Sequence, residues 1–152
     1  MKLRCINLNP TSKPLGKSDE SGFSFAKEML EGDVTAGINF DRIQKHPEYG
    51  YIIFEYLLCE ESQPFVTPYR SHPRFYWKMN SKKFISLWKV SKDLNAKLFL
   101  VNYAKKGTRH ENEILRIEVE EMDDTGIKRE TVTKMTRDQF KVFFRKLNKE
   151  CL

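Results

Sequence analysis

The chain has 152 residues, of which 39% are hydrophobic and 32% are charged, and its formal net charge is +6 at pH 7. This composition excludes a largely disordered protein, and the length is enough for one domain with a real core over residues 1–152. No stretch approaches the roughly 18 apolar residues of a membrane helix, so we expect no membrane association.

The first half of the chain predicts a helix between strands, followed by a long loop. Residues 3–8 are typical of a strand, and a serine cap before apolar residues at helical spacing predicts a helix over 21–31. The apolar runs 34–41 and 51–59 predict two strands joined by a turn. Three prolines exclude regular structure from most of 60–79, which we interpret as a functional loop because aromatic and arginine residues crowd it.

The second half predicts two helices and three strands. A helix begins at residue 80 or 81 and runs through 94, with its lysines mostly on the face opposite the apolar residues. Residues 97–103 predict a strand that packs directly against this helix. Residues 113–122 and 128–134 predict a hairpin, and Thr136 caps a last helix whose phenylalanines recur at helical spacing.

Two acids lie in otherwise apolar segments. Asp41 closes the first predicted strand of the central pair, and Glu55 interrupts the second, 51–59, which is apolar enough to be covered on both faces. A carboxylate there is costly unless a cation, a metal or several hydrogen bonds satisfy it. Apart from a metal, Asp41 has Arg42 or the following turn as a partner, and Glu55 has Lys83 or a loop arginine.

Positive charge is concentrated in one part of the chain. Residues 65–109 contain eleven basic residues and one acid, Asp93, interleaved with nine aromatic residues. Basic and aromatic side chains together suit a phosphate backbone and unstacked bases, although a core of aromatics under a solvated lysine face gives the same pattern. We expect nucleic-acid contacts from Arg70, His72, Arg74, Lys78, Lys82 and Lys89, with His72 otherwise an ordinary polar loop residue.

The order of these features resembles the core of the restriction-endonuclease-like, or PD-(D/E)xK, nuclease superfamily. A helix precedes a strand ending in Asp41, a strand carrying Glu55, a helix beginning near Lys83 and a further strand. The similarity covers about residues 21–103 and leaves 104–152 as a C-terminal hairpin and helix. It implies an α/β or α+β fold with a central mixed sheet flanked by helices, and two acids that bind a divalent metal.

The sequence departs from the family pattern at two positions. Phe40 stands where the motif often has proline, and Leu57 stands where it has lysine. Some members are thought to supply the lysine from the following helix, and Lys83 suits this role because it projects from the apolar flank of that helix. Helix acids sometimes add a metal ligand, which here is Glu28, with Glu31 nearly as eligible.

The resemblance implies a phosphodiesterase that uses Mg²⁺ or Mn²⁺ to cleave DNA or RNA. Asp41 and Glu55 would hold the metal, and Lys83 would position the water or stabilise charge on the phosphate. The alternative is a non-catalytic module that binds nucleic acid or a protein, for example as an inhibitor of a nuclease. Leu57 favours this alternative, whereas the buried acid favours the enzyme. Three widely spaced cysteines and the absence of a signal-peptide core predict a cytoplasmic protein.

Overall fold

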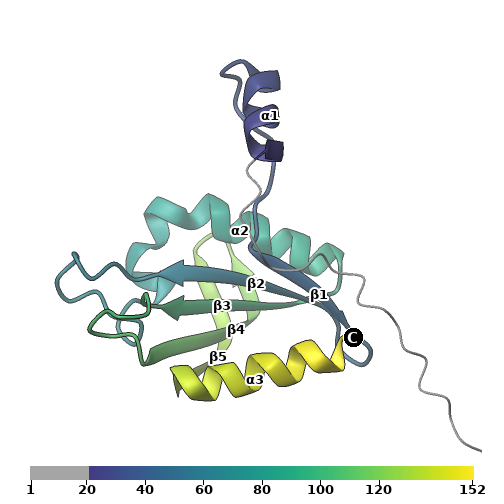
Figure 1. Ribbon diagram of the computed structural model, residues 1–152. Helices are drawn as coiled ribbons and strands as arrows, with labels where there is room; N and C mark the ends of the chain where they lie inside the picture. The colour runs from purple at the N-terminus through teal and green to yellow at the C-terminus, as the bar shows by residue number, and fades with distance from the viewer. Residues whose placement is uncertain (1–20) are drawn as a thin grey trace, which may run out of the picture. The chain divides into compact units, whose positions relative to one another are not determined.

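The computed structural model describes residues 21–152 (Figure 1). They divide into two units. The first contains helix α1 (Ser21–Leu30) and ends at Gly37, and the second spans Ile38–Cys151 and contains the other helices and the strands. Helix α1 confirms the predicted helix at 21–31, whereas the predicted strand at 3–8 lies outside the described residues.

The second unit is built on a five-stranded mixed sheet with the strand order β1-β2-β3-β4-β5. Strands β2 and β3 are parallel and joined through a helix, while the other neighbours are antiparallel. Together with the helices, this sheet confirms an α+β protein. The strands are β1 (Arg42–His46), β2 (Gly50–Leu58), β3 (Lys97–Tyr103), β4 (Glu113–Asp123) and β5 (Gly126–Thr136).

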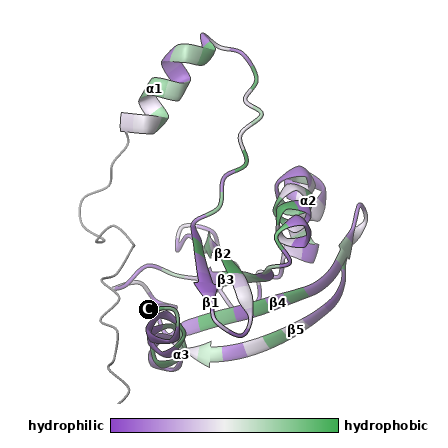
Figure 2. Ribbon diagram, turned by 90° about the vertical axis from the view of Figure 1, so that its right-hand side faces the viewer, coloured by the Kyte–Doolittle hydropathy of each residue, from purple (hydrophilic) through white to green (hydrophobic). Residues whose placement is uncertain are grey.

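One long helix covers each face of the sheet. Figure 2 shows α2 (Trp77–Asp93) on one side and α3 (Arg137–Glu150) on the other. A short 3-10 helix, η1 (Pro73–Tyr76), leads directly into α2. None of the helices within residues 21–152 has the length and apolar character that a membrane span requires.

The central strands are apolar on both faces because both faces are covered. In β3, Leu98 and Leu100 pack toward α2, and Phe99 and Val101 pack toward α3. Successive strand residues point to opposite faces, so a run without polar alternation is what a doubly covered strand requires. The α2-facing core also contains Ile53, Phe84, Leu87, Leu115, Ile117, Val119 and Met122.

Helix α3 begins as the sequence predicts. The Thr136 hydroxyl accepts a hydrogen bond of 3.1 Å from the Gln139 N–H, and the Gln139 side chain accepts one of 2.9 Å from the Thr136 N–H. This reciprocal capping box satisfies two N–H groups that an uncapped helix end leaves without partners. From this start, Phe140, Phe143 and Phe144 pack onto the sheet.

Two predicted boundaries are wrong. The structure forms β1 at Arg42–His46 rather than at 34–41, and α2 begins at Trp77, before the predicted start. The sequence of β1 lacks the apolar pattern of a strand because its inward side chains are polar. Arg42, for example, donates a hydrogen bond of 2.7 Å to Asn148 at the polar end of α3. The early start of α2 follows from η1, which already holds the chain in a helical turn.

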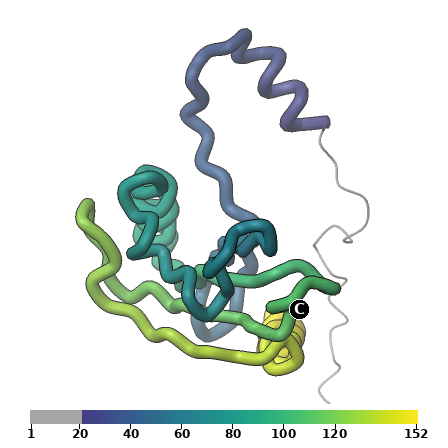
Figure 3. Tube along the Cα trace, turned by 90° about the vertical axis from the view of Figure 1, so that its left-hand side faces the viewer, coloured from purple at the N-terminus to yellow at the C-terminus, as the bar shows by residue number. Residues whose placement is uncertain are grey.

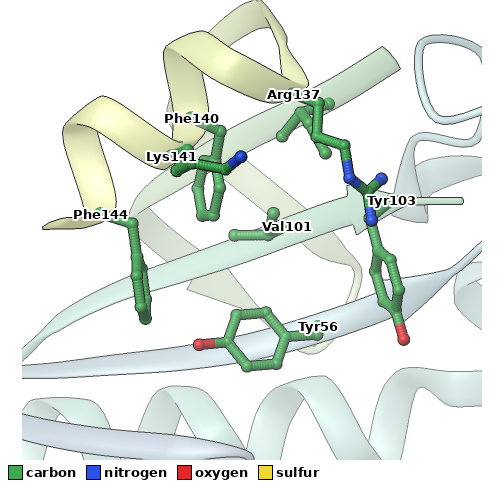
Figure 4. A pocket seen from close by; sticks show the side chains of 8 residues that line it. Tyr56, Val101, Tyr103, Arg137, Phe140, Lys141 and Phe144 are labelled. Atoms are coloured by element: carbon green, nitrogen blue, oxygen red, sulfur yellow. The ribbon is translucent and has the colours of Figure 1, made fainter. Parts of the chain in front are cut away.

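An apolar cavity of about 440 Å³ lies between α3 and the sheet (Figure 4). Phe140 and Phe144 of α3 border it on one side and Tyr56 and Val101 on the other. The half-buried Tyr56 ring borders this apolar space, and burial raises the pKa of Tyr56 to about 12. On the opposite face Tyr76 packs 6.1 Å from Phe84, and burial raises the pKa of Tyr76 to about 12 as well.

These tyrosines should make the protein unstable in alkali. A raised pKa means that each phenol stabilises the fold fully below about pH 10, and that this contribution is lost as the pH rises toward about 12. We expect a loss of about 2–3 kcal/mol in unfolding free energy for each ring over that range. Urea unfolding between about pH 8 and about pH 12 measures it, with Tyr56→Phe and Tyr76→Phe as comparisons. Parallel curves for parent and variants would contradict the prediction.

Candidate active site

Asp41 lies directly before β1, beside the middle of β2. The β1–β2 ladder begins with Arg42 opposite Phe54, so the preceding residue, Asp41, lies next to Glu55 and Tyr56. The Oδ2 of Asp41 accepts a hydrogen bond of 2.7 Å from the main-chain N–H of Tyr56, which fixes the carboxylate there. The hairpin thus brings together the two acids that the sequence singles out.

Glu55 is a buried carboxylate on the α2-facing side of the sheet. Only 5% of the residue is exposed, and the adjacent residues on its face of β2 are Ile53 and Leu57. Burial raises the pKa of Glu55, because loss of water outweighs the opposing effect of the Lys83 ammonium, and the charge of Asp41 raises it further. The acid in the apolar run is therefore as costly as the sequence predicts.

Lys83 is the cation that Glu55 meets. Its Nζ forms an ion pair with the Oε1 of Glu55, while 44% of the lysine side chain remains exposed. Lys83 is in the second turn of α2, from where its stem reaches the sheet and its ammonium reaches the surface. Of the predicted catalytic residues, Glu55 thus pairs with Lys83 and neighbours Asp41, although the three come from separate segments of the chain.

One oxygen of this cluster is left without a good hydrogen bond. The Oε2 of Glu55 is buried and makes no hydrogen bond of good geometry with a described residue, although the main-chain N–H of Asp41 acts on the carboxylate and, against the larger effect of burial, lowers the pKa of Glu55. A buried carboxylate oxygen left in this state costs about 1–3 kcal/mol or more, so it is a position where a cation would be stabilised.

Asp41 and Glu55 fit a divalent metal only if water and substrate phosphate supply the remaining ligands. Asp41 and Glu55 supply hard oxygen ligands, which Mg²⁺ and Mn²⁺ prefer, and Mg²⁺ is often held by one or two carboxylates with water and phosphate completing the shell. Between residues 21 and 152 no three His, Cys, Asp or Glu side chains gather at one point. Glu28 lies on α1, in the other unit, and its part in a metal site stays a prediction.

The loop between β2 and η1 is held against the end of the sheet. The buried Asn102 of β3 donates hydrogen bonds to the Pro68 carbonyl at 3.1 Å and the Ser71 carbonyl at 2.8 Å. The Tyr69 hydroxyl donates to the Met135 carbonyl at 2.9 Å. Figure 3 shows this loop beside the loop that follows β3, at one end of the sheet. The loop is thus a fixed part of the surface rather than a free connection.

His72 is one of the residues that hold this loop. Its Nδ1 accepts a hydrogen bond of 3.0 Å from the N–H of Arg74, and its Nε2 lies 2.8 Å from a carboxylate oxygen of Glu130 on β5. Since Nδ1 is an acceptor, we infer that the proton is on Nε2 and is donated to Glu130. Both ring nitrogens have partners within the protein, which gives His72 a structural role, and its contact with phosphate stays a prediction.

The other residues predicted to bind nucleic acid are exposed. Arg70 projects from the loop and Arg74 from η1, and the guanidinium of Arg74 lies 4.8 Å from the centre of the Phe75 ring. None of these basic residues forms an ion pair with an acid among residues 21–152, so their charge faces solvent. On α2, residues four and seven positions apart share one face, which makes a lysine stripe of Lys78, Lys82 and Lys89.

Sequence reasoning missed two residues of this region. Asn102 carried a usable signal. Like Glu55 within 51–59, it is a polar residue within an apolar strand, 97–103, and therefore needs a hydrogen-bond partner. Phe65 belongs to the basic and aromatic segment 65–109 but was not singled out within it, since a phenylalanine in the sequence is usually part of the core, yet 87% of this residue is exposed. Only the folded loop reveals it.

Comparisons with models of protein families, with curated proteins and with solved structures find no significant match to this chain. The resemblance to the PD-(D/E)xK superfamily thus stays a prediction. It depends on Asp41, Glu55 and Lys83 and on the order of the elements that carry them.

Proposed function

We propose that this chain is a metal-dependent phosphodiesterase that cleaves nucleic acid. Asp41 and Glu55 hold Mg²⁺ or Mn²⁺, and Lys83 acts on the substrate phosphate. The observation that carries the proposal is Glu55, a buried acid whose Oε1 is paired with Lys83 and whose Oε2 makes no hydrogen bond of good geometry with a described residue, next to a second acid. Glu55 is the buried member of this group and its burial is costly to the fold, and metal-dependent chemistry would account for its retention beside the exposed Asp41.

Each of the three residues has a separate task in this mechanism. Asp41 and Glu55 would hold the cation, whose positive charge would polarise a phosphate and acidify a water molecule. Asp41 is held in position by the Tyr56 N–H, and the burial of Glu55 strengthens the attraction of its carboxylate for cations. The exposed ammonium of Lys83 donates hydrogen bonds to phosphate oxygens as their negative charge grows.

Binding without cleavage is the second candidate function. Leu57 occupies the position of the motif lysine, and the ion pair with Lys83 already compensates one oxygen of Glu55 without a metal. The exposed basic residues on the loop and on α2 would then bind the nucleic acid alone. If the protein binds no nucleic acid even at low salt, a protein partner becomes the better explanation.

A cleavage assay with Asp41→Asn separates these functions. We expect the parent to cut single-stranded, duplex or branched substrates with Mg²⁺ or Mn²⁺ but not in EDTA, and Asp41→Asn to be at least about 100-fold slower, because an amide is a poorer ligand by several kcal/mol. The amide oxygen can still accept the Tyr56 N–H, so the fold should persist. Asp93→Asn, an exposed acid at the end of α2, is the matched control. Equal rates for parent and Asp41→Asn would refute the mechanism.

A further inference from the structure

Two cavities adjoin at the end of the sheet where β2 and β3 finish. One, of about 670 Å³, is bordered by Lys83, Tyr76 and Met79, and the other, of about 730 Å³, by Arg109, Lys134 and Tyr69. Phe65 and Arg70 line both cavities, so these two residues form a ridge between them. We refer to these two adjoining cavities together as the groove, and Lys83 lines one half of it.

The groove is positively charged along its length. The first cavity is lined by the basic residues Lys83 and Arg70. The second is lined by Arg70 as well, together with Arg109 and Lys134. Glu113 is the one acid lining either cavity in the described chain, and it is engaged by His110 at 2.5 Å and by the Tyr69 N–H at 3.4 Å. A groove of this charge suits a polyanion whose phosphates lie a few ångströms apart.

Phe65 presents an aromatic ring at the middle of the groove. It is 87% exposed, and its backbone has a φ of 69°, in the left-handed region that phenylalanine rarely adopts. Such a conformation persists only when the surroundings impose it, and it is found disproportionately at functional sites. The buried Pro68 and the hydrogen bonds from Asn102 fix the loop just after Phe65. Phe75 and Met79, also exposed, line the Lys83 half of the groove.

We propose that this groove binds single-stranded nucleic acid, with a base stacked on Phe65 and phosphates on Arg70 and Arg109, a substrate assignment that rests on the proposed function. In a duplex the base faces are already stacked, so the ring of Phe65 has no partner there. In a single strand every base offers a face, and stacking on an aromatic ring contributes about 1–3 kcal/mol per base. The strand then continues along the groove to Lys83, whose ammonium pairs with Glu55.

Fluorescence anisotropy in EDTA tests the groove without any cleavage. The probes are a labelled 12-nucleotide DNA strand, its RNA equivalent and the same DNA as a duplex. We expect Phe65→Ala to weaken both single strands about 10-fold and Phe65→Trp to keep the affinity, while the duplex binds more weakly and does not respond to Phe65→Ala. Tyr51→Ala, at the other end of β2, is the control for loss of an exposed aromatic residue.

The salt dependence of the same measurement tests Arg70. Arg70→Gln should reduce the slope of log affinity against log salt by about 0.7, the value for one phosphate contact on a single strand. Unchanged single-strand affinity in Phe65→Ala, or a duplex that binds as tightly and responds equally, would overturn the inference. Binding that depends on Phe65, without cleavage in any metal, would overturn the proposed function alone. A cleavage rate that is unchanged in Phe65→Ala would overturn the single-strand assignment of the groove alone.

Discussion

Glu55→Gln is expected to lower the rate of metal-dependent cleavage at least about 100-fold while the free energy of unfolding at pH 7 stays within about 1 kcal/mol of the parent. The amide removes a metal ligand but also removes a buried charge. The Lys83 left behind is 44% exposed, so its ammonium can return to water. Initial cleavage rates and urea unfolding of the same preparation measure the two effects. Glu118→Gln is the control, because Glu118 also pairs with a lysine, Lys97, at 3.0 Å.

Lys83→Met is the contrasting variant, since it leaves the charge of Glu55 buried and alone. Removing one partner of a buried pair costs about 3–5 kcal/mol, and the exposure of Lys83 places our expectation at the lower end, about 3 kcal/mol at pH 7. The double variant Glu55→Gln with Lys83→Met should recover most of this loss. A double variant as unstable as Lys83→Met alone would show that the lysine stabilises the fold by packing rather than through Glu55.

The pH dependence of stability distinguishes the same variants. The pKa of Glu55 is raised in the folded protein, so the folded state binds the proton more tightly than the unfolded state. Its contribution to stability is therefore fully present below the ordinary pKa of a glutamate and is lost as the pH rises through the raised value. Glu55→Gln should remove that part of the decline, so its stability relative to the parent should increase with pH over this window.

Asn102→Asp is expected to destabilise the protein by about 4 kcal/mol at pH 7 and to weaken single-strand binding as well. The amide of Asn102 donates to two loop carbonyls, whereas an ionised carboxylate donates nothing and places a buried negative charge against both oxygens. The loss should shrink in acid, where the carboxyl is protonated. Urea unfolding at pH 5 and pH 7 and anisotropy with the single strand measure the effect.

Two control variants separate the causes of the expected Asn102→Asp effect. Asn112→Asp changes the same chemistry at an exposed position and should alter stability by less than about 0.5 kcal/mol. Asn102→Leu removes the donors without adding a charge, and we expect an intermediate loss of about 2 kcal/mol. If Asn102→Asp binds the single strand with parental affinity while still folded, the anchored loop is not what presents Phe65.

Local patterns in the sequence predict most of the elements but not all of their limits. The helix after Thr136, the strand 97–103 and the hairpin that follows depend on capping and on periodicity within one segment, and each is present. Strand β1 was misplaced because its residues alternate without a clear apolar face. Its inward side chains, Arg42, Gln44 and His46, bond to residues more than a hundred positions away, which no local window contains.

The candidate site, too, is predicted in part by the sequence and decided in part by the tertiary structure. A carboxylate in the apolar run 51–59 must find a partner, and the sequence alone establishes that requirement from the free energy of burying a charge. Which partner it finds depends on the packing of α2 against the sheet, which pairs Glu55 with Lys83, and on the β1–β2 register, which brings Asp41 beside it. Similarly, the sequence determines that His72 and Phe65 lie in a proline-rich loop. Only the tertiary contacts bury the first against Glu130 and expose the second, because those contacts join segments that the chain itself keeps far apart.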